Sequence, residues 1–96
     1  MDYPTLDLTA TGERIKELRV KNNLRVKDIS IFMGFENDQA VYKWQRGDSL
    51  PSVDNLYALS LLFGVTIDEI LVGNKKESDC SSFLFYALHS FYYLLV

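Results

Sequence analysis

Apolar residues recur every three or four positions through most of the chain, which is the spacing of an amphipathic helix. Glycine and asparagine residues interrupt this pattern and divide it into segments of helical length. No alternation typical of strands and no internal repeat is present before residue 80. The pattern therefore predicts an all-α bundle of five helices, over residues 9–21, 26–33, 38–46, 53–63 and 66–73.

The apolar side of each predicted helix should face a common core. Ser52 has the position of an N-cap, Thr66 and Glu69 have the spacing of a capping box, and Asn37 or Asp38 can cap the third helix. Trp44 is expected to be a packing anchor. The residues expected to point inward are Ile15, Leu18, Val26, Ile29, Phe32, Met33, Val41, Trp44, Val53, Leu56, Leu59 and Phe63.

The last part of the chain has a different character. Residues 74–82 are polar and are expected to form a linker, whereas residues 80–96 contain no charged side chain and six aromatic ones. Residues 83–96 are expected to form a final helix, although their aromatic content also fits a β-hairpin. A membrane span needs about 20 residues and an interfacial helix usually has a basic face, so membrane binding is not expected.

Composition limits the range of functions. A chain of 96 residues suits one domain, placed here at residues 1–73. One cysteine and one histidine provide no disulfide, no cysteine-rich zinc site and no nucleophile–base pair, so neither an enzyme nor a metal or other cofactor is expected. The first residues lack the apolar core of a signal peptide, which favours a cytoplasmic location.

The net charge of −3 argues against a nucleic-acid-binding protein when the chain is taken as a whole. The charge is unevenly distributed, however. Residues 14–46 hold eight cationic and four acidic side chains, which gives +4, and the remainder holds two cationic and nine acidic ones, which gives −7. The average therefore conceals a basic segment around the predicted second and third helices.

A series of short motifs follows one another along residues 9–73. The motifs include Gly12-Glu13-Arg14-Ile15-Lys16-Glu17-Leu18-Arg19, Met33-Gly34, Trp44-Gln45-Arg46-Gly47, Leu50-Pro51-Ser52 and Gly64-Val65-Thr66-Ile67-Asp68-Glu69. Together they resemble the phage-repressor-like helix-turn-helix family, also called the xenobiotic-response-element family. Residues 39–47 further resemble a subgroup common in Gram-positive bacteria, in which the turn between the second and third helices is one residue longer.

The resemblance implies a five-helix DNA-binding domain in which the third helix enters the major groove of double-stranded DNA. Side chains at the start of that helix would then contact base edges. The residues implied in base readout are Asn37, Asp38, Gln39, Tyr42 and Lys43. Those implied in phosphate contacts, which set register without reading sequence, are Arg25, Lys27 and Arg46.

The leading interpretation is a sequence-specific transcriptional regulator, a repressor, that binds DNA as a homodimer because each recognition helix reads one half-site. The alternative is a protein-interaction module, antitoxin-like or partner-binding, on the same scaffold. Acidic Glu36 and Asp38 near the third helix keep this alternative open. The apolar surface expected to serve it consists of Tyr57, Leu61, Leu84, Leu88 and Phe91.

Overall fold

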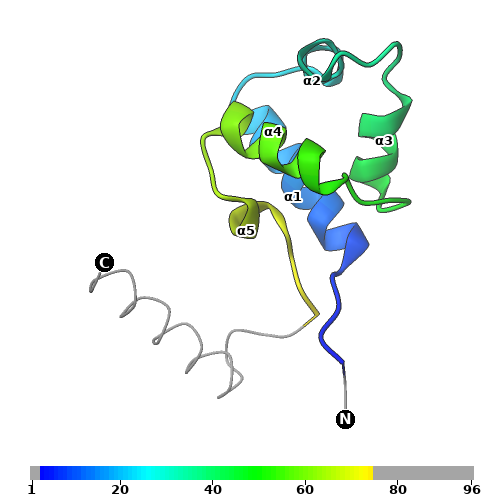
Figure 1. The fold of residues 1–96 in the computed structure, drawn as a ribbon, viewed down its shortest axis with the longest axis vertical. Helices are drawn as coiled ribbons and strands as arrows, with labels where there is room; N and C mark the ends of the chain where they lie inside the picture. The colour runs from blue at the N-terminus through cyan, green and yellow to red at the C-terminus, as the bar shows by residue number, and fades with distance from the viewer. Residues whose placement is uncertain (1–2, 75–96) are drawn as a thin grey trace, which may run out of the picture.

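The structure is a computed structural model, and it describes residues 3–74. The predicted final helix over residues 83–96 and all but the first residue of the predicted linker lie outside this range. The all-α prediction is confirmed (Figure 1). The helices are α1 (Leu8–Lys21), α2 (Val26–Met33), α3 (Gln39–Arg46), α4 (Val53–Phe63) and α5 (Ile67–Ile70).

Local caps explain where the helices begin and end. Both α2 and α4 have the predicted bounds, and the Ser52 hydroxyl accepts a hydrogen bond from the Asn55 N–H at 3.2 Å, as an N-cap should. The α1 helix begins one residue early because Asp7, which the sequence analysis did not consider, caps it. The Asp7 Oδ1 atom accepts a hydrogen bond from the Ala10 N–H at 3.0 Å.

The fifth helix is shorter than expected, because it ends at Ile70 and not at Gly73. The segment that follows pairs with the N-terminal segment of the chain. The Asp7 N–H donates to the Val72 carbonyl oxygen at 2.8 Å, and Leu6 forms an antiparallel bridge with Gly73. This pairing holds the backbone extended and prevents the helix from continuing.

The core lies between the helices and consists of Ile15, Leu18, Val26, Ile29, Val41, Trp44, Leu56, Leu59, Phe63 and Ile70. Two predicted core residues are wrong, because Phe32 is 51% exposed and Val53 is 76% exposed. The buried side of α2 is formed by Val26, Ile29 and Ser30, and Phe32 lies on a different side of the helix. Val53 lies four residues before Tyr57 and shares its outward side.

The backbones of α1 and α3 approach one another closely at Gly12, where a side chain would meet backbone oxygens. A Cβ atom added to Gly12 would contact the Trp44 carbonyl oxygen and would lie 2.6 Å from the Gln45 carbonyl oxygen. The Trp44 ring also packs edge-on against the Phe35 ring, at a centroid distance of 5.9 Å. These contacts fix the position of α3 relative to α1.

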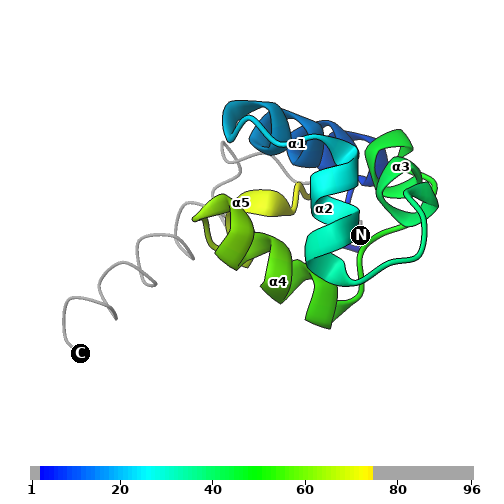
Figure 2. The ribbon, with the colours of Figure 1, turned by 90° about the horizontal axis from the view of Figure 1, so that it is seen from above.

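The α3 and α5 helices lie at opposite sides of the bundle in both views (Figures 1 and 2). The α2 helix connects to α3 through residues 34–38, and Gly34 ends α2 in the left-handed conformation, with φ of 76°. One end of the bundle is therefore formed by this helix pair. Within residues 3–74, no helix is long and apolar enough to cross a membrane.

Candidate nucleic-acid interface

The α3 helix presents one polar face to solvent. Val41 and Trp44 are buried on its inner side. On the outer side, the exposed side chains are spaced by three, four and seven residues from the first, which places them on one face of a helix. This outer face consists of Gln39, Tyr42, Lys43 and Arg46. The structure thus brings together four of the residues that the resemblance implicated in DNA contacts.

The two residues before α3 differ in whether their side chains form a hydrogen bond with the start of the helix. The Asn37 Oδ1 atom accepts a hydrogen bond from the Gln39 N–H at 3.0 Å. Asp38 occupies the N-cap position, but its carboxylate makes no capping hydrogen bond. Of the two candidates for a capping role, Asn37 is therefore the one that binds the end of the helix, while the Asp38 side chain is only partly buried.

A charged side chain is held at the start of α2. The Asp28 carboxylate accepts a hydrogen bond from the Arg25 backbone N–H at 2.8 Å and from its guanidinium Nη2 at 2.9 Å. The side-chain hydrogen bond, followed by the backbone one, lowers the pKa of Asp28, and the same pair raises the pKa of Arg25. Arg25 remains 74% exposed, so a fixed cation faces solvent at this helix end.

Acidification is expected to remove the stabilisation that Asp28 provides. Because the folded chain lowers the pKa of Asp28 below 3.8, this stabilisation is present above that value and is lost as pH falls through the folded pKa. Chemical denaturation of the native chain and of Asp28→Asn should therefore differ near neutral pH, and the difference should shrink as pH falls through the folded pKa of Asp28. A difference that stays constant down to the lowest pH would contradict this assignment.

The remaining cations of the interface differ in their partners. The Arg46 Nε atom lies 2.9 Å from Asp48 Oδ2, and both side chains are more than half exposed. Lys27 and Lys43 are exposed, and neither forms an ion pair with any residue in the range 3–74. The lysines are thus available to an anionic partner directly, whereas the arginine must share its charge with Asp48.

Arg19 joins α1 to α3, a role that its position in the sequence motif does not reveal. Its Nε atom donates to Gln45 Oε1 at 2.9 Å, and its Nη1 atom donates to the Leu24 carbonyl oxygen at 2.9 Å. The side chain is partly buried and bridges α1, the turn before α2, and α3. It therefore helps to hold the helix pair in one geometry.

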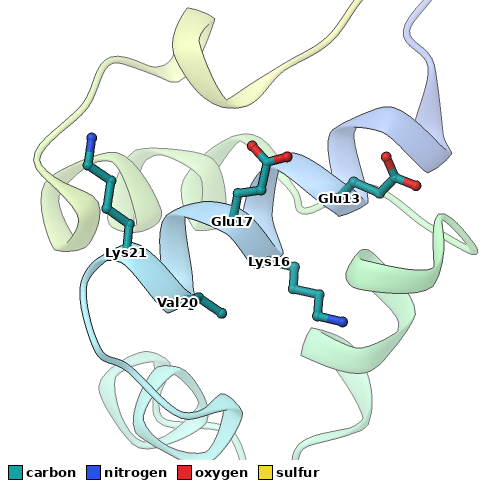
Figure 3. A pocket seen from close by; sticks show the side chains of 5 residues that line it. All are labelled: Glu13, Lys16, Glu17, Val20 and Lys21. Atoms are coloured by element: carbon teal, nitrogen blue, oxygen red, sulfur yellow. The ribbon is translucent and has the colours of Figure 1, made fainter.

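A shallow, open pocket lies along α1 (Figure 3). Its lining includes Glu13, Lys16, Glu17, Val20 and Lys21. The two carboxylates point to one side of the helix and Lys16 to the other, so the polar groups do not converge. Within residues 3–74, no group of three His, Cys, Asp or Glu side chains could hold a metal ion. The outer face of α3 remains the better candidate site.

Two short helices joined by a tight turn, the second with a polar outer face, define a helix-turn-helix domain. A helix-turn-helix family model matches residues 15–70, which is more than half of the chain. The chain therefore belongs to this helix-turn-helix family, as the motifs indicated. The family comprises transcriptional regulators and is not enzymatic, in agreement with the expectation from composition.

Two transcriptional regulators are similar in sequence to this chain. The HTH-type transcriptional activator BcrR of Enterococcus faecalis is 32% identical over 64 residues, which cover 67% of this chain and 31% of the relative. The HTH-type transcriptional regulator DdrOP3 of Deinococcus deserti is 32% identical over 71 residues, which cover 70% of this chain and 51% of the relative. The chain thus spans about a third and about half of these proteins.

Solved structures confirm the repressor-like fold. The restriction-modification controller protein C.AhdI from Aeromonas hydrophila superposes with a TM-score of 0.60 and 25% identity, covering 67% of this chain and 96% of that protein. The P22 c2 repressor, solved in complex with a synthetic operator, gives a TM-score of 0.58 and 30% identity, covering 62% and 89% respectively. Both resemblances fall on the helical bundle.

Proposed function

We propose that this chain is a sequence-specific DNA-binding transcriptional regulator that reads the major groove of double-stranded DNA with α3. The observation that carries the proposal is the exposed face formed by Gln39, Tyr42, Lys43 and Arg46 on a helix-turn-helix scaffold. The P22 c2 repressor, which shares the fold at 30% identity, was solved with an operator. The same kind of docking suits the geometry of α2 and α3.

The side chains on and before α3 differ in what they can recognise. Gln39 can make a bidentate contact with adenine, and Lys43 can donate to guanine O6 and N7. The Asn37 oxygen is occupied by the Gln39 N–H, which leaves its amide nitrogen free to donate to a base. Asp38 can accept from a cytosine amino group, and Tyr42 completes the set that we assign to base readout.

Phosphate contacts are assigned to Arg25, Lys27 and Arg46. Arg25 is held at the start of α2 by Asp28, so its guanidinium is already ordered before a phosphate arrives. Lys27 lies two residues further along and is exposed. Arg46 would bind phosphate either by breaking its ion pair with Asp48 or by contacting both groups at once. Such contacts contribute affinity and register, and not discrimination between bases.

We further infer that the chain belongs to the Gram-positive subgroup with the longer turn, because residues 34–38 separate α2 from α3. We also infer that it acts as a repressor, as the P22 protein does by name, although the Enterococcus faecalis relative is named an activator. A reporter gene placed behind a selected binding site would separate the two modes. Repression predicts that expression rises when Lys43→Ala replaces the native chain.

The first test is selection of bound sites from random DNA. The native chain should enrich a defined sequence, and Gln39→Ala should lose preference at one base position, with a cost of about 1–3 kcal/mol there. The measurement is binding to the selected site and to single-base variants of it. An unaltered preference in Gln39→Ala would rule out its assigned role, and failure to enrich any sequence would favour the protein-interaction module.

Lys27→Ala should weaken binding to every DNA sequence by a similar factor, because a phosphate contact does not depend on the base. It should also reduce the slope of log affinity against log salt concentration by about one. Lys21→Ala is the matched control, since Lys21 is another exposed lysine, and it points away from α3 (Figure 3). Equal losses in the two variants would indicate a diffuse charge effect and no defined contact.

A further inference from the structure

Arg19 is bound to both parts of the chain that we assign to the DNA interface, although it belongs to neither of them. It lies near the end of α1, and its side chain is partly buried. Its guanidinium donates to the Gln45 Oε1 atom of α3 and to the Leu24 carbonyl oxygen, each at 2.9 Å. The two donors belong to one rigid planar group, so the two acceptors are held in a fixed arrangement.

The contact with Leu24 fixes the start of α2. Both backbone groups of Leu24 are bound to Arg19, because the Leu24 N–H also donates to the Arg19 carbonyl oxygen at 3.0 Å. The next residue, Arg25, is the N-cap of α2, and Lys27 follows two residues later. The positions of these two cations, which we assign to phosphate contacts, therefore depend on Arg19.

The contact with Gln45 fixes α3. Gln45 lies between Trp44, which is buried in the core, and Arg46, which is exposed on the outer face. A hydrogen bond to a side chain at this position restrains rotation of α3 about its own axis. Such a rotation would turn Gln39 and Lys43 away from the base edges that they are to contact, so the bond affects recognition as well as packing.

The partners of Arg19 are neutral. Gln45 provides an amide oxygen and Leu24 a backbone carbonyl oxygen, and Arg19 forms no ion pair with any residue in the range 3–74. Both exposed arginines of the interface, by contrast, are paired with an aspartate. The positive charge of Arg19 is therefore not cancelled by its own partners, and it adds to the field that attracts a phosphate backbone.

We propose that Arg19 is a positioning residue for DNA recognition. It holds the phosphate-binding start of α2 and the base-reading face of α3 in one register, so that a phosphate contact made by α2 places the side chains of α3 opposite their bases. Its neutral partner Gln45 provides this bond without cancelling the charge. The inference rests on the proposed function, because it concerns how two parts of the same interface act together.

The test uses the site selected from random DNA and measures the ratio of its affinity to that of its single-base variants. All proteins are full chains, compared at a temperature where circular dichroism shows them folded. Arg19→Ala should lower this ratio about tenfold, which is the discrimination provided by one well-placed base contact. Arg19→Lys should lower it as well, because lysine keeps the charge but lacks the planar pair of donors, and this variant serves if Arg19→Ala does not fold.

Arg14→Ala is the matched control. Arg14 is also an arginine of α1, but its Nε atom donates to the Glu69 carbonyl oxygen of α5 at 2.8 Å. The α5 helix lies at the opposite side of the bundle from α3 (Figures 1 and 2). The substitution removes one charge and one bond between helices, so it should weaken binding to all sequences by a similar factor and leave the ratio unchanged.

Gln45→Glu separates the effect of position from the effect of charge. Glutamate keeps an oxygen acceptor for Arg19, so the ratio should equal that of the native chain. It also adds a negative charge beside this cation, so binding to every sequence should be weaker than in the native chain. This difference between the two proteins should shrink as salt is added, because salt screens the charge.

An unchanged ratio in Arg19→Ala or Arg19→Lys, or an equal loss in Arg14→Ala, would overturn the positioning role while the native chain still selects a defined site. A lower ratio in Gln45→Glu would also overturn it, and unaltered affinity in that variant would overturn the role of the charge. A native chain that selects no sequence would instead overturn the proposed function, and this inference with it.

Discussion

Gly12→Ala is expected to destabilise the domain by at least about 3 kcal/mol, the upper end of the usual cost of overpacking. The added methyl group would meet the Trp44 and Gln45 carbonyl oxygens, which are backbone atoms and cannot rotate away. Alanine is favoured over glycine inside a helix by roughly 0.5–1 kcal/mol, which is too little to offset the clash. Chemical denaturation measures the free energy of unfolding directly.

Gly64→Ala is the matched control for this substitution. Unlike Gly12, which lies inside α1, Gly64 ends α4 in the left-handed conformation, with φ of 70°, and nothing lies within 4 Å of the added methyl group. Its replacement should therefore cost only the backbone strain of about 1–2 kcal/mol. If Gly12→Ala were no more destabilising than Gly64→Ala, the close approach of α1 and α3 would be wrong.

Trp44→Ala is expected to lower the free energy of unfolding by about 3–5 kcal/mol, as is usual for a buried aromatic residue. Trp44 is 4% exposed, packs against the Phe35 ring, and lies beside Gly12 at the contact between α1 and α3. Its removal would leave a cavity beneath the helix that we assign to base readout. Thermal melting followed by circular dichroism provides the measurement.

Tyr42→Ala separates a packing effect from an effect on the exposed face. Tyr42 lies on the same helix but is 47% exposed, so its removal should change stability by no more than about 0.5 kcal/mol. The two variants should also differ in DNA binding at a temperature where both are folded. A large loss of stability in Tyr42→Ala would show that the outer face of α3 is part of the packed structure.

Much of the fold is predictable from local signals. Gly34 and Gly64 end α2 and α4, and Ser52 begins α4, because these residues satisfy or release backbone groups next to them in the chain. Val41 and Trp44 could be placed inside, and Gln39 and Lys43 outside, from helical spacing alone. The residues on the outer face of α3 can therefore be predicted from the sequence.

Features that depend on contacts between residues far apart in the sequence could not be predicted from the sequence. The early end of α5 results from pairing with Leu6 and Asp7, and the bond between Arg19 and Gln45 joins residues 26 positions apart. The exposure of Phe32 depends on which side of α2 faces the core, and the burial of Ser30 shows which side that is. None of these features can be predicted from the local sequence pattern, because residues far away in the sequence decide each of them.

The pairing of residues 5–7 with residues 72–74 also affects the order in which the domain assembles. The hydrogen bond from Thr5 to Asn74 joins residues 69 positions apart, whereas the helices and their turns depend on neighbours in the chain. The entropic cost of closing such a long loop is recovered only after the helices between its ends are compact. The two ends of the domain are thus expected to join last during folding and to separate first during unfolding. The pairing of residues 5–7 with residues 72–74 would then close a helical bundle that has already formed.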